Sequence, residues 1–114
     1  MRFGLKDTTI QKIQSVLVRY PQVEKAILYG SRAKGNYKNG SDIDLTLRGD
    51  ADLTLNVLYK IMEKLDDLLL PYTIDLSIYN NINDPDVIEH IDRVGVTFYE
   101  KVVLREETRM TNGK

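Results

Sequence analysis

Hydrophobic positions along the chain follow two periods, about 3.6 residues and 2 residues, and each period predicts a different element. The helical period is found in three segments, residues 7–20, 53–69 and 85–94. Pro21 follows the first segment, and a proline disfavours the helical conformation of the residue before it. Pro85 opens the third segment at the first helical position, and Gly95 ends it.

Shorter segments with apolar alternation predict strands at residues 23–29, 41–47 and 72–79, and residues 96–100 are expected to be extended. In the second strand Ile43, Leu45 and Leu47 point to one face, so Asp42 and Asp44 point to the other. Asp75 has the equivalent polar position in the third strand. The long helix between the second and third strands is typical of the crossover connection in an α/β sheet.

Composition narrows the class of protein. The chain has 114 residues, which fits a single domain, expected over residues 1–104 with a polar, disordered tail at 105–114. Sixteen basic and 17 acidic residues give a net charge of −1, so a generally cationic nucleic-acid binder is not expected. The absence of cysteine excludes a disulfide framework and a thiolate zinc site. No signal peptide or membrane-spanning run is visible in the sequence, and a cytoplasmic location is expected.

The carboxylates of the second and third strands are candidates for a metal site. Asp42 and Asp44 are two residues apart, so their side chains leave one face about 6.5–7 Å apart. Like charges this close disfavour ionisation unless a cation lies between them. Hard oxygen ligands favour Mg²⁺ or Mn²⁺, and Asp75 would arrive about 5 Å away if its strand is the neighbour. The alternative is that all three are solvated positions on an open sheet face.

The turn after the first strand is a candidate phosphate site. Gly30 lets the backbone approach a ligand closely, and Ser31 offers an N–H and a hydroxyl. Arg32 and Lys34 are nearby cations that could pair with phosphate oxygens. An ordinary turn followed by a solvated loop is the alternative. His90, the one histidine, is expected to be a structural or surface residue.

Together these motifs carry a resemblance. Gly30-Ser31, ten residues and then Asp42-Ile43-Asp44 resemble the signature of the polymerase-beta-like nucleotidyltransferase superfamily. The wording GSRAKG…SDIDL with the later YTIDLSIY is similar to its minimal nucleotidyltransferase family, and the likeness covers roughly residues 8–101. The resemblance implies an α/β (α+β) fold: a small mixed sheet of three or slightly more strands, in the order 1-2-3, flanked by helices.

The resemblance also implies a function. Asp42 and Asp44 would bind two Mg²⁺ ions, Asp75 would bind one of them and help deprotonate an attacking hydroxyl, and Gly30 and Ser31 would hold the phosphates of ATP or another nucleoside triphosphate. Short members of the family often pair with a helical HEPN-type protein, some as antitoxins that attach AMP to a tyrosine of the toxin. A binding-only antitoxin, an enzyme acting on a small-molecule hydroxyl such as an aminoglycoside, and a homodimer stay open as alternatives.

Overall fold

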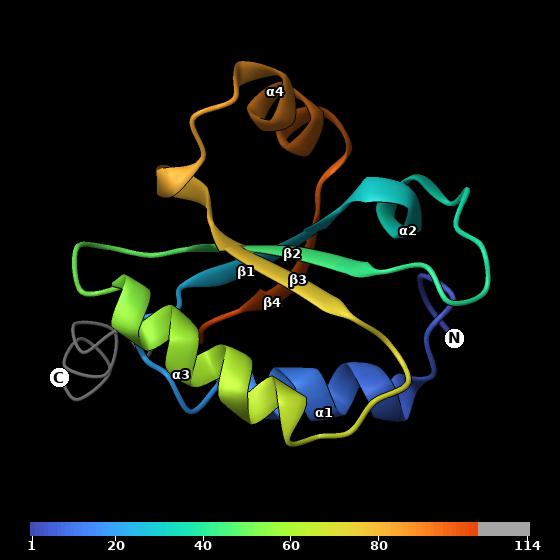
Figure 1. Ribbon diagram of the computed structural model, residues 1–114, viewed down its shortest axis with the longest axis horizontal. Helices are drawn as coiled ribbons and strands as arrows, with labels where there is room; N and C mark the ends of the chain where they lie inside the picture. The colour runs from blue at the N-terminus through green and yellow to red at the C-terminus, as the bar shows by residue number, and fades with distance from the viewer. Residues whose placement is uncertain (103–114) are drawn as a thin grey trace, which may run out of the picture.

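Residues 1–102 are described by a computed structural model, in which a four-stranded sheet has helices on both faces (Figure 1). The predicted tail at 105–114 and the end of the predicted domain at residue 104 lie outside these residues. The elements in chain order are α1 (Asp7–Leu17), β1 (Lys25–Tyr29), α2 (Gly30–Lys34), β2 (Ile43–Arg48), α3 (Leu55–Asp66), β3 (Ile74–Ile78), a 3₁₀ turn (Tyr79–Asn81), α4 (Pro85–Val94) and β4 (Val96–Glu100).

The strands lie in the order β3-β2-β1-β4, so the predicted order 1-2-3 is confirmed and the last strand joins the sheet beside β1. β2 and β3 are parallel, as the predicted crossover through α3 requires, whereas β1 is antiparallel to both of its neighbours. The sheet is therefore mixed, and its two edges are β3 and β4.

One face of the sheet packs on α1 and α3 to form the hydrophobic core (Figure 1). Ile43, Leu45 and Leu47 of β2 are fully buried there, which confirms the predicted alternation. From the helices, Ile13 and Leu17 of α1 and Ile61 of α3 enter the same core. Further core positions are Leu28, Leu58, Leu65, Leu76, Ile78 and Phe98.

The opposite face carries polar residues and is partly covered by α4 (Figure 1). Ile91 of α4 is buried, and a Cβ built on Gly95 would lie 2.7 Å from a methyl group of Ile27, so this helix packs closely on β1. Thr46 is also fully buried on this face and accepts a hydrogen bond of 2.9 Å from the Ser77 hydroxyl. This second layer brings α4 into contact with β1 and with α2.

α1 and α3 are shorter than the sequence predicts, whereas α4 has the predicted bounds. Thr54 caps α3 by accepting a hydrogen bond from the backbone N–H of Val57 at 3.4 Å, so the helix begins two residues later than expected. Asp84 caps α4 by accepting from the N–H of Asp86 at 2.9 Å, with Pro85 at the first position as predicted. Within residues 1–102, no helix has the length and apolar character needed to cross a bilayer.

Candidate active site

Two of the predicted aspartates lie side by side. Asp44 of β2 and Asp75 of β3 are direct register partners in the parallel ladder, and Tyr29 of β1 is the partner of Asp44 on its other side. Neighbouring strands are about 4.8 Å apart, and paired residues send their side chains to the same face. Asp44 is half-buried and Asp75 is exposed, so the pair lies at the border between α4 and solvent.

The third aspartate lies just outside the strand. Asp42 precedes the first residue of β2 and is exposed. Burial raises the pKa of the Asp44 carboxyl, the negative charges of Asp75 and Asp42 raise it further, and His90 lowers it. Both other carboxylates are therefore close enough to affect the charge of Asp44, and their repulsion is what a bound cation would relieve.

The donor set fits a hard divalent cation, although it is not closed around one point. Within the part of the chain that the structure describes, no group of three acidic, histidine or cysteine side chains already has the arrangement of a metal site. Carboxylate oxygens that repel one another are suited to Mg²⁺, which keeps several waters and needs only one or two protein carboxylates in addition to substrate phosphates. The pairing of Asp44 with Asp75 supplies two such carboxylates.

The Gly-Ser turn lies directly against this pair. Gly30 has φ +75°, and a Cβ built on it would collide with the carboxylate of Asp44, whose Cγ lies 3.3 Å from that position. Any other residue would therefore be strained and would displace the carboxylate. Ser31 follows at the beginning of α2 and is half-buried, whereas Lys34 is exposed in its last turn. The structure thus brings the predicted phosphate turn and the predicted metal ligands to one place.

Arg32 has a different environment from the one that the sequence suggests. Only 3% of it is exposed, and its guanidinium donates two hydrogen bonds to the carbonyl of Ser41, at 3.1 and 2.9 Å, and one to the carbonyl of Phe3 at 2.8 Å. It also stacks on the rings of Tyr37 and Tyr72. These contacts fix Ser41, the residue before Asp42. The alternative of a solvated position for Arg32 is therefore wrong, and the contact of Arg32 with phosphate stays a prediction.

His90 has a structural role, as expected from the sequence, and this role is at the site. The backbone N–H of Gly30 donates to its Nε2 at 3.2 Å, and its ring meets that of Tyr29 edge to face with centroids 6.2 Å apart. Because Nε2 accepts, this hydrogen bond requires the neutral tautomer with the proton on Nδ1. His90 thus connects α4 to the phosphate turn.

Tyr29 is the second residue at the site that sequence reasoning missed. Burial raises the pKa of its phenol, the charges of Asp75 and Asp44 raise it further, and the Ser77 hydroxyl lowers it. The helical period contained a signal for His90, because residues 87, 90, 91 and 94 share one face and Val87, Ile91 and Val94 are apolar. No such signal points to Tyr29, whose role depends on strand pairing.

Comparisons with known proteins identify the family and the fold. Residues 11–102 match the family Polbeta, described as "Polymerase beta, Nucleotidyltransferase". A solved toxin–antitoxin with AMP-PNP is 18% identical, covers 93% of this chain and 80% of its own, and has a TM-score of 0.63. A second solved structure is a tri-AMPylated HEPN toxin from Shewanella oneidensis in complex with an MNT antitoxin. It is 16% identical, the match covers 93% of this chain and 79% of that chain, and the TM-score is 0.62. Among curated protein sequences, none matches this chain.

A candidate minimal nucleotidyltransferase is also similar: it is 21% identical, the match covers 84% of this chain and 95% of that chain, and the TM-score is 0.60. At these identities the solved structures establish the fold alone. The match to the family over residues 11–102 extends from α1 to the end of β4 and includes every predicted site residue.

Proposed function

The chain belongs to the polymerase beta nucleotidyltransferase family, and on this premise we propose that it transfers AMP from ATP to a tyrosine hydroxyl of a HEPN-type helical partner protein. In this role it would act as the antitoxin of a toxin–antitoxin pair. The proposed donor is ATP. The proposed cofactor is a pair of Mg²⁺ ions, or Mn²⁺ in their place.

One observation supports this proposal most strongly: the Gly30 backbone lies against the carboxylate of Asp44, which is itself the register partner of Asp75. A triphosphate held at the turn would therefore lie beside two carboxylates. Such an arrangement suits transfer at phosphorus, where the protein mainly positions the reactants and neutralises charge.

Asp42, Asp44 and Asp75 would hold the metal. Burial and the negative charges of Asp75 and Asp42 raise the pKa of the Asp44 carboxyl. A bound cation would offset the repulsion between these carboxylates and favour the ionised form of Asp44. When bound, Mg²⁺ lowers the pKa of an attacking hydroxyl and neutralises charge on a leaving pyrophosphate.

The chain's own residues would position the reactants. Ser31 would hold the β- and γ-phosphates through its backbone N–H and its hydroxyl, and Gly30, whose own N–H donates to His90, would let the phosphates approach the backbone closely, with Lys34 as an additional cation. The acceptor oxygen attacks the α-phosphorus, the bond from that phosphorus to the bridging oxygen breaks, and pyrophosphate leaves with the electron pair. Asp75, the exposed member of the pair, would accept the proton from the acceptor hydroxyl.

The identity of the acceptor rests on the solved relatives. Structures of this fold include an antitoxin with an AMPylated HEPN toxin and a toxin–antitoxin with AMP-PNP. We infer the same kind of donor and partner for this chain. No feature within residues 1–102 indicates a basic nucleic-acid surface, and the net charge is −1.

The test is incubation of the protein with MgATP and a purified HEPN-type candidate partner, using ATP labelled at either the α- or the γ-phosphate. The proposal predicts that the α-label, and not the γ-label, becomes attached to the partner, and that Asp44→Asn abolishes this attachment. Tight partner binding without labelling would favour a binding-only antitoxin. Labelling of an added aminoglycoside, and not of the partner, would favour a small-molecule acceptor.

A further inference from the structure

Exposed apolar side chains gather on the outer face of α3. Leu55, Tyr59 and Met62 are 50%, 58% and 38% exposed, and they follow one another at intervals of four and three residues. Residues at this spacing share one face of a helix. The core-facing side of α3 is separately apolar, through Leu58, Ile61 and Leu65. The helix therefore has a second apolar face that the described fold does not cover.

Leu69, three residues beyond the end of α3, is a further exposed apolar side chain in this segment, separated from Met62 by the exposed Asp66. It is 88% exposed and has φ +54°. Glycine is the usual residue for the left-handed conformation that follows a helix, and a leucine there is strained. Neither burial nor backbone geometry favours leucine at this position. Leu55, Tyr59, Met62 and Leu69 are called the α3 stripe below.

The stripe leads into a depression at the edge of the sheet. Leu69, Leu70, Tyr72 and Ile74 line this depression, which has a volume of about 340 Å³, and Asp66 of α3 lies at its border with the stripe. Tyr72 is half-buried. The depression ends one residue before Asp75, on β3, which is an edge strand.

Charge beside the stripe limits what can bind to it. Glu63 and Asp66 of α3 and Asp67 just beyond its end are exposed, and within residues 1–102 none of them forms a salt bridge. These three carboxylates outnumber the one exposed lysine of α3, Lys60. A partner that covers the apolar side chains would gain from cations opposite these carboxylates. The helical spacing of the stripe fits another helix laid along it.

We propose that the α3 stripe binds an amphipathic helix of the acceptor protein, one whose apolar seam is flanked by lysine or arginine. This inference rests on the proposed function, because it names the surface by which that same acceptor is held. α3 has 12 residues and is about 18 Å long, enough for roughly three turns of a partner helix.

The position of the stripe suits transfer at the carboxylate pair. α3 lies on the core face of the sheet, opposite to the face that carries the carboxylates (Figure 1), and β3 is the edge strand that ends the sheet on this side. A helix seated on α3 would hold its protein at this edge. The next segment of that protein could then pass around β3 and present a hydroxyl to Asp75.

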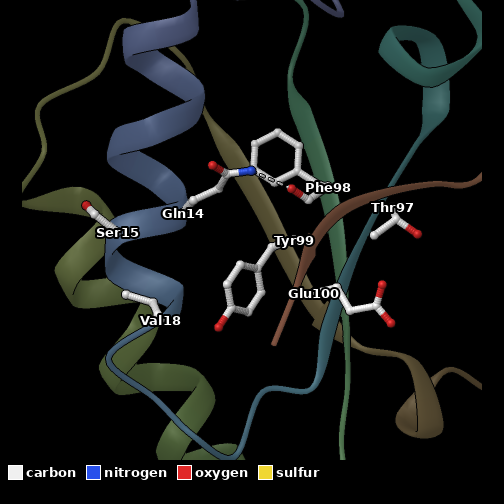
Figure 2. Close-up of a pocket in the computed structure, with 7 residues that line it drawn as sticks. All are labelled: Gln14, Ser15, Val18, Thr97, Phe98, Tyr99 and Glu100. Atoms are coloured by element: carbon white, nitrogen blue, oxygen red, sulfur yellow. Dashed lines mark hydrogen bonds between the residues drawn. The ribbon is translucent and has the colours of Figure 1, made fainter. Parts of the chain in front are cut away.

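A second groove provides a matched control. It lies between α1 and β4, at the other edge of the sheet, and is lined by Gln14, Val18 and Tyr99 among others (Figure 2). Val18 is 62% exposed, similar to Tyr59, but the side chain of Gln14 donates to the carbonyl of Phe98 at 2.8 Å and covers part of the strand edge. Val18→Lys therefore changes an equally exposed apolar residue away from the stripe.

The experiment compares Tyr59→Lys/Met62→Lys, Leu69→Gly and Val18→Lys with the wild type. Dissociation constants for the HEPN-type partner, KM and kcat for labelling, and ATP binding are measured for each. The double variant is expected to weaken partner binding about 30-fold or more, the level of an interface hot spot, and to raise KM for the partner without changing ATP binding. Val18→Lys is expected to match the wild type.

Leu69→Gly keeps the test valid if the lysine variants lose stability. Glycine relieves the left-handed strain, so the melting temperature should not fall while partner binding weakens. Wild-type affinity for the partner in both the double variant and Leu69→Gly would overturn the proposal. The proposal would also be overturned if these substitutions convert a dimer of this chain into a monomer and leave partner binding intact. Weakened binding in a system that transfers no AMP would support the docking surface and refute the proposed reaction. AMP transfer that is unchanged in the stripe variants would support the proposed reaction and refute the docking surface.

Discussion

Asp44 and Asp75 are direct register partners on the parallel strands β2 and β3, and they are 31 positions apart in the sequence with α3 between them. The pair exists only because the crossover through α3 places β3 beside β2 in this register. A shift of one residue would send one of the two carboxylates to the core face. The candidate site therefore depends on the topology of the sheet as much as on the motif.

Asp44→Asn should separate stability from activity. The raised pKa of Asp44 means that the folded state favours the protonated carboxyl, so wild-type stability falls as pH rises from about 4 through that pKa. The neutral amide removes this loss, and the variant should melt at a higher temperature than the wild type at pH 7. Labelling of the partner should fall at least about 1,000-fold, because an amide is a poor metal ligand and carries no negative charge to balance that of a bound cation. Thermal melts from pH 4 to 8 and labelling rates test both.

The exposed Asp52 provides the control for that variant. Asp52→Asn should leave labelling unchanged. Addition of Mg²⁺ should raise the melting temperature of the wild type and of Asp52→Asn, but not of Asp44→Asn, since ligands stabilise only the state that binds them. Equal stabilisation of all three proteins by Mg²⁺ would argue against a metal at Asp44.

Gly30→Ala should remove ATP binding. The new methyl group would collide with the Asp44 carboxylate, in addition to the strain of a positive φ. Gly40→Ala is the matched control, because Gly40 has φ +81° and nothing lies within 4 Å of its Cβ position. Both variants should lose about 1–2 kcal/mol of stability from backbone strain. Only Gly30→Ala should also lose ATP affinity, which calorimetric titration would measure; equal losses of affinity would show that the collision with Asp44 is unimportant.

Arg32→Lys should destabilise the protein although the charge is kept. Lysine cannot reproduce the three hydrogen bonds to Ser41 and Phe3 from one planar group, so acceptors in a buried region would lose their partners. The expected loss is about 2–3 kcal/mol in the free energy of unfolding, measured by denaturation in urea. Lys34→Ala, at an exposed position of the same helix, should change stability by less than about 0.5 kcal/mol. Similar stability in the two variants would contradict the structural role of Arg32.

His90→Phe should show how much the contact between α4 and the phosphate turn contributes to the free energy of unfolding. Phenylalanine keeps an aromatic ring beside Tyr29 but leaves the N–H of Gly30 without its acceptor. The expected cost is about 1 kcal/mol of stability. His90→Gln retains an acceptor at the end of the side chain and should recover part of this loss. If glutamine is the more destabilising of the two, ring packing and not the hydrogen bond holds the turn.

Local patterns in the sequence predicted most elements of the fold. The alternation in β2 identified its buried face, and the proline and glycine around α4 identified both ends of that helix. Predicted boundaries of the other elements were two or three residues too wide at several ends, because capping by Thr54 and the turns after Leu17 depend on local hydrogen bonds that periodicity does not register.

The site was less predictable where it depends on tertiary contacts. Gly30, Ser31 and the three aspartates carry a motif, but the burial of Arg32 follows from carbonyls of Phe3 and Ser41, which no spacing rule brings together. His90 reaches Gly30 across 60 residues because α4 packs over β1. A cation near a Gly-Ser turn and a histidine on a late helix look alike in sequence whether they bind ligand or support the turn.

The most direct test of the central claim is the intact mass of the purified HEPN-type partner after incubation with this protein and MgATP, followed by peptide mapping. Nucleotidyl transfer at the carboxylate pair predicts that the partner gains the mass of one or more AMP groups on tyrosine. It predicts no gain with Asp44→Asn or Asp75→Asn, although both variants should still bind the partner. An unchanged partner mass with the wild-type protein, or an equal gain with the two variants, would contradict the claim that these aspartates catalyse AMP transfer.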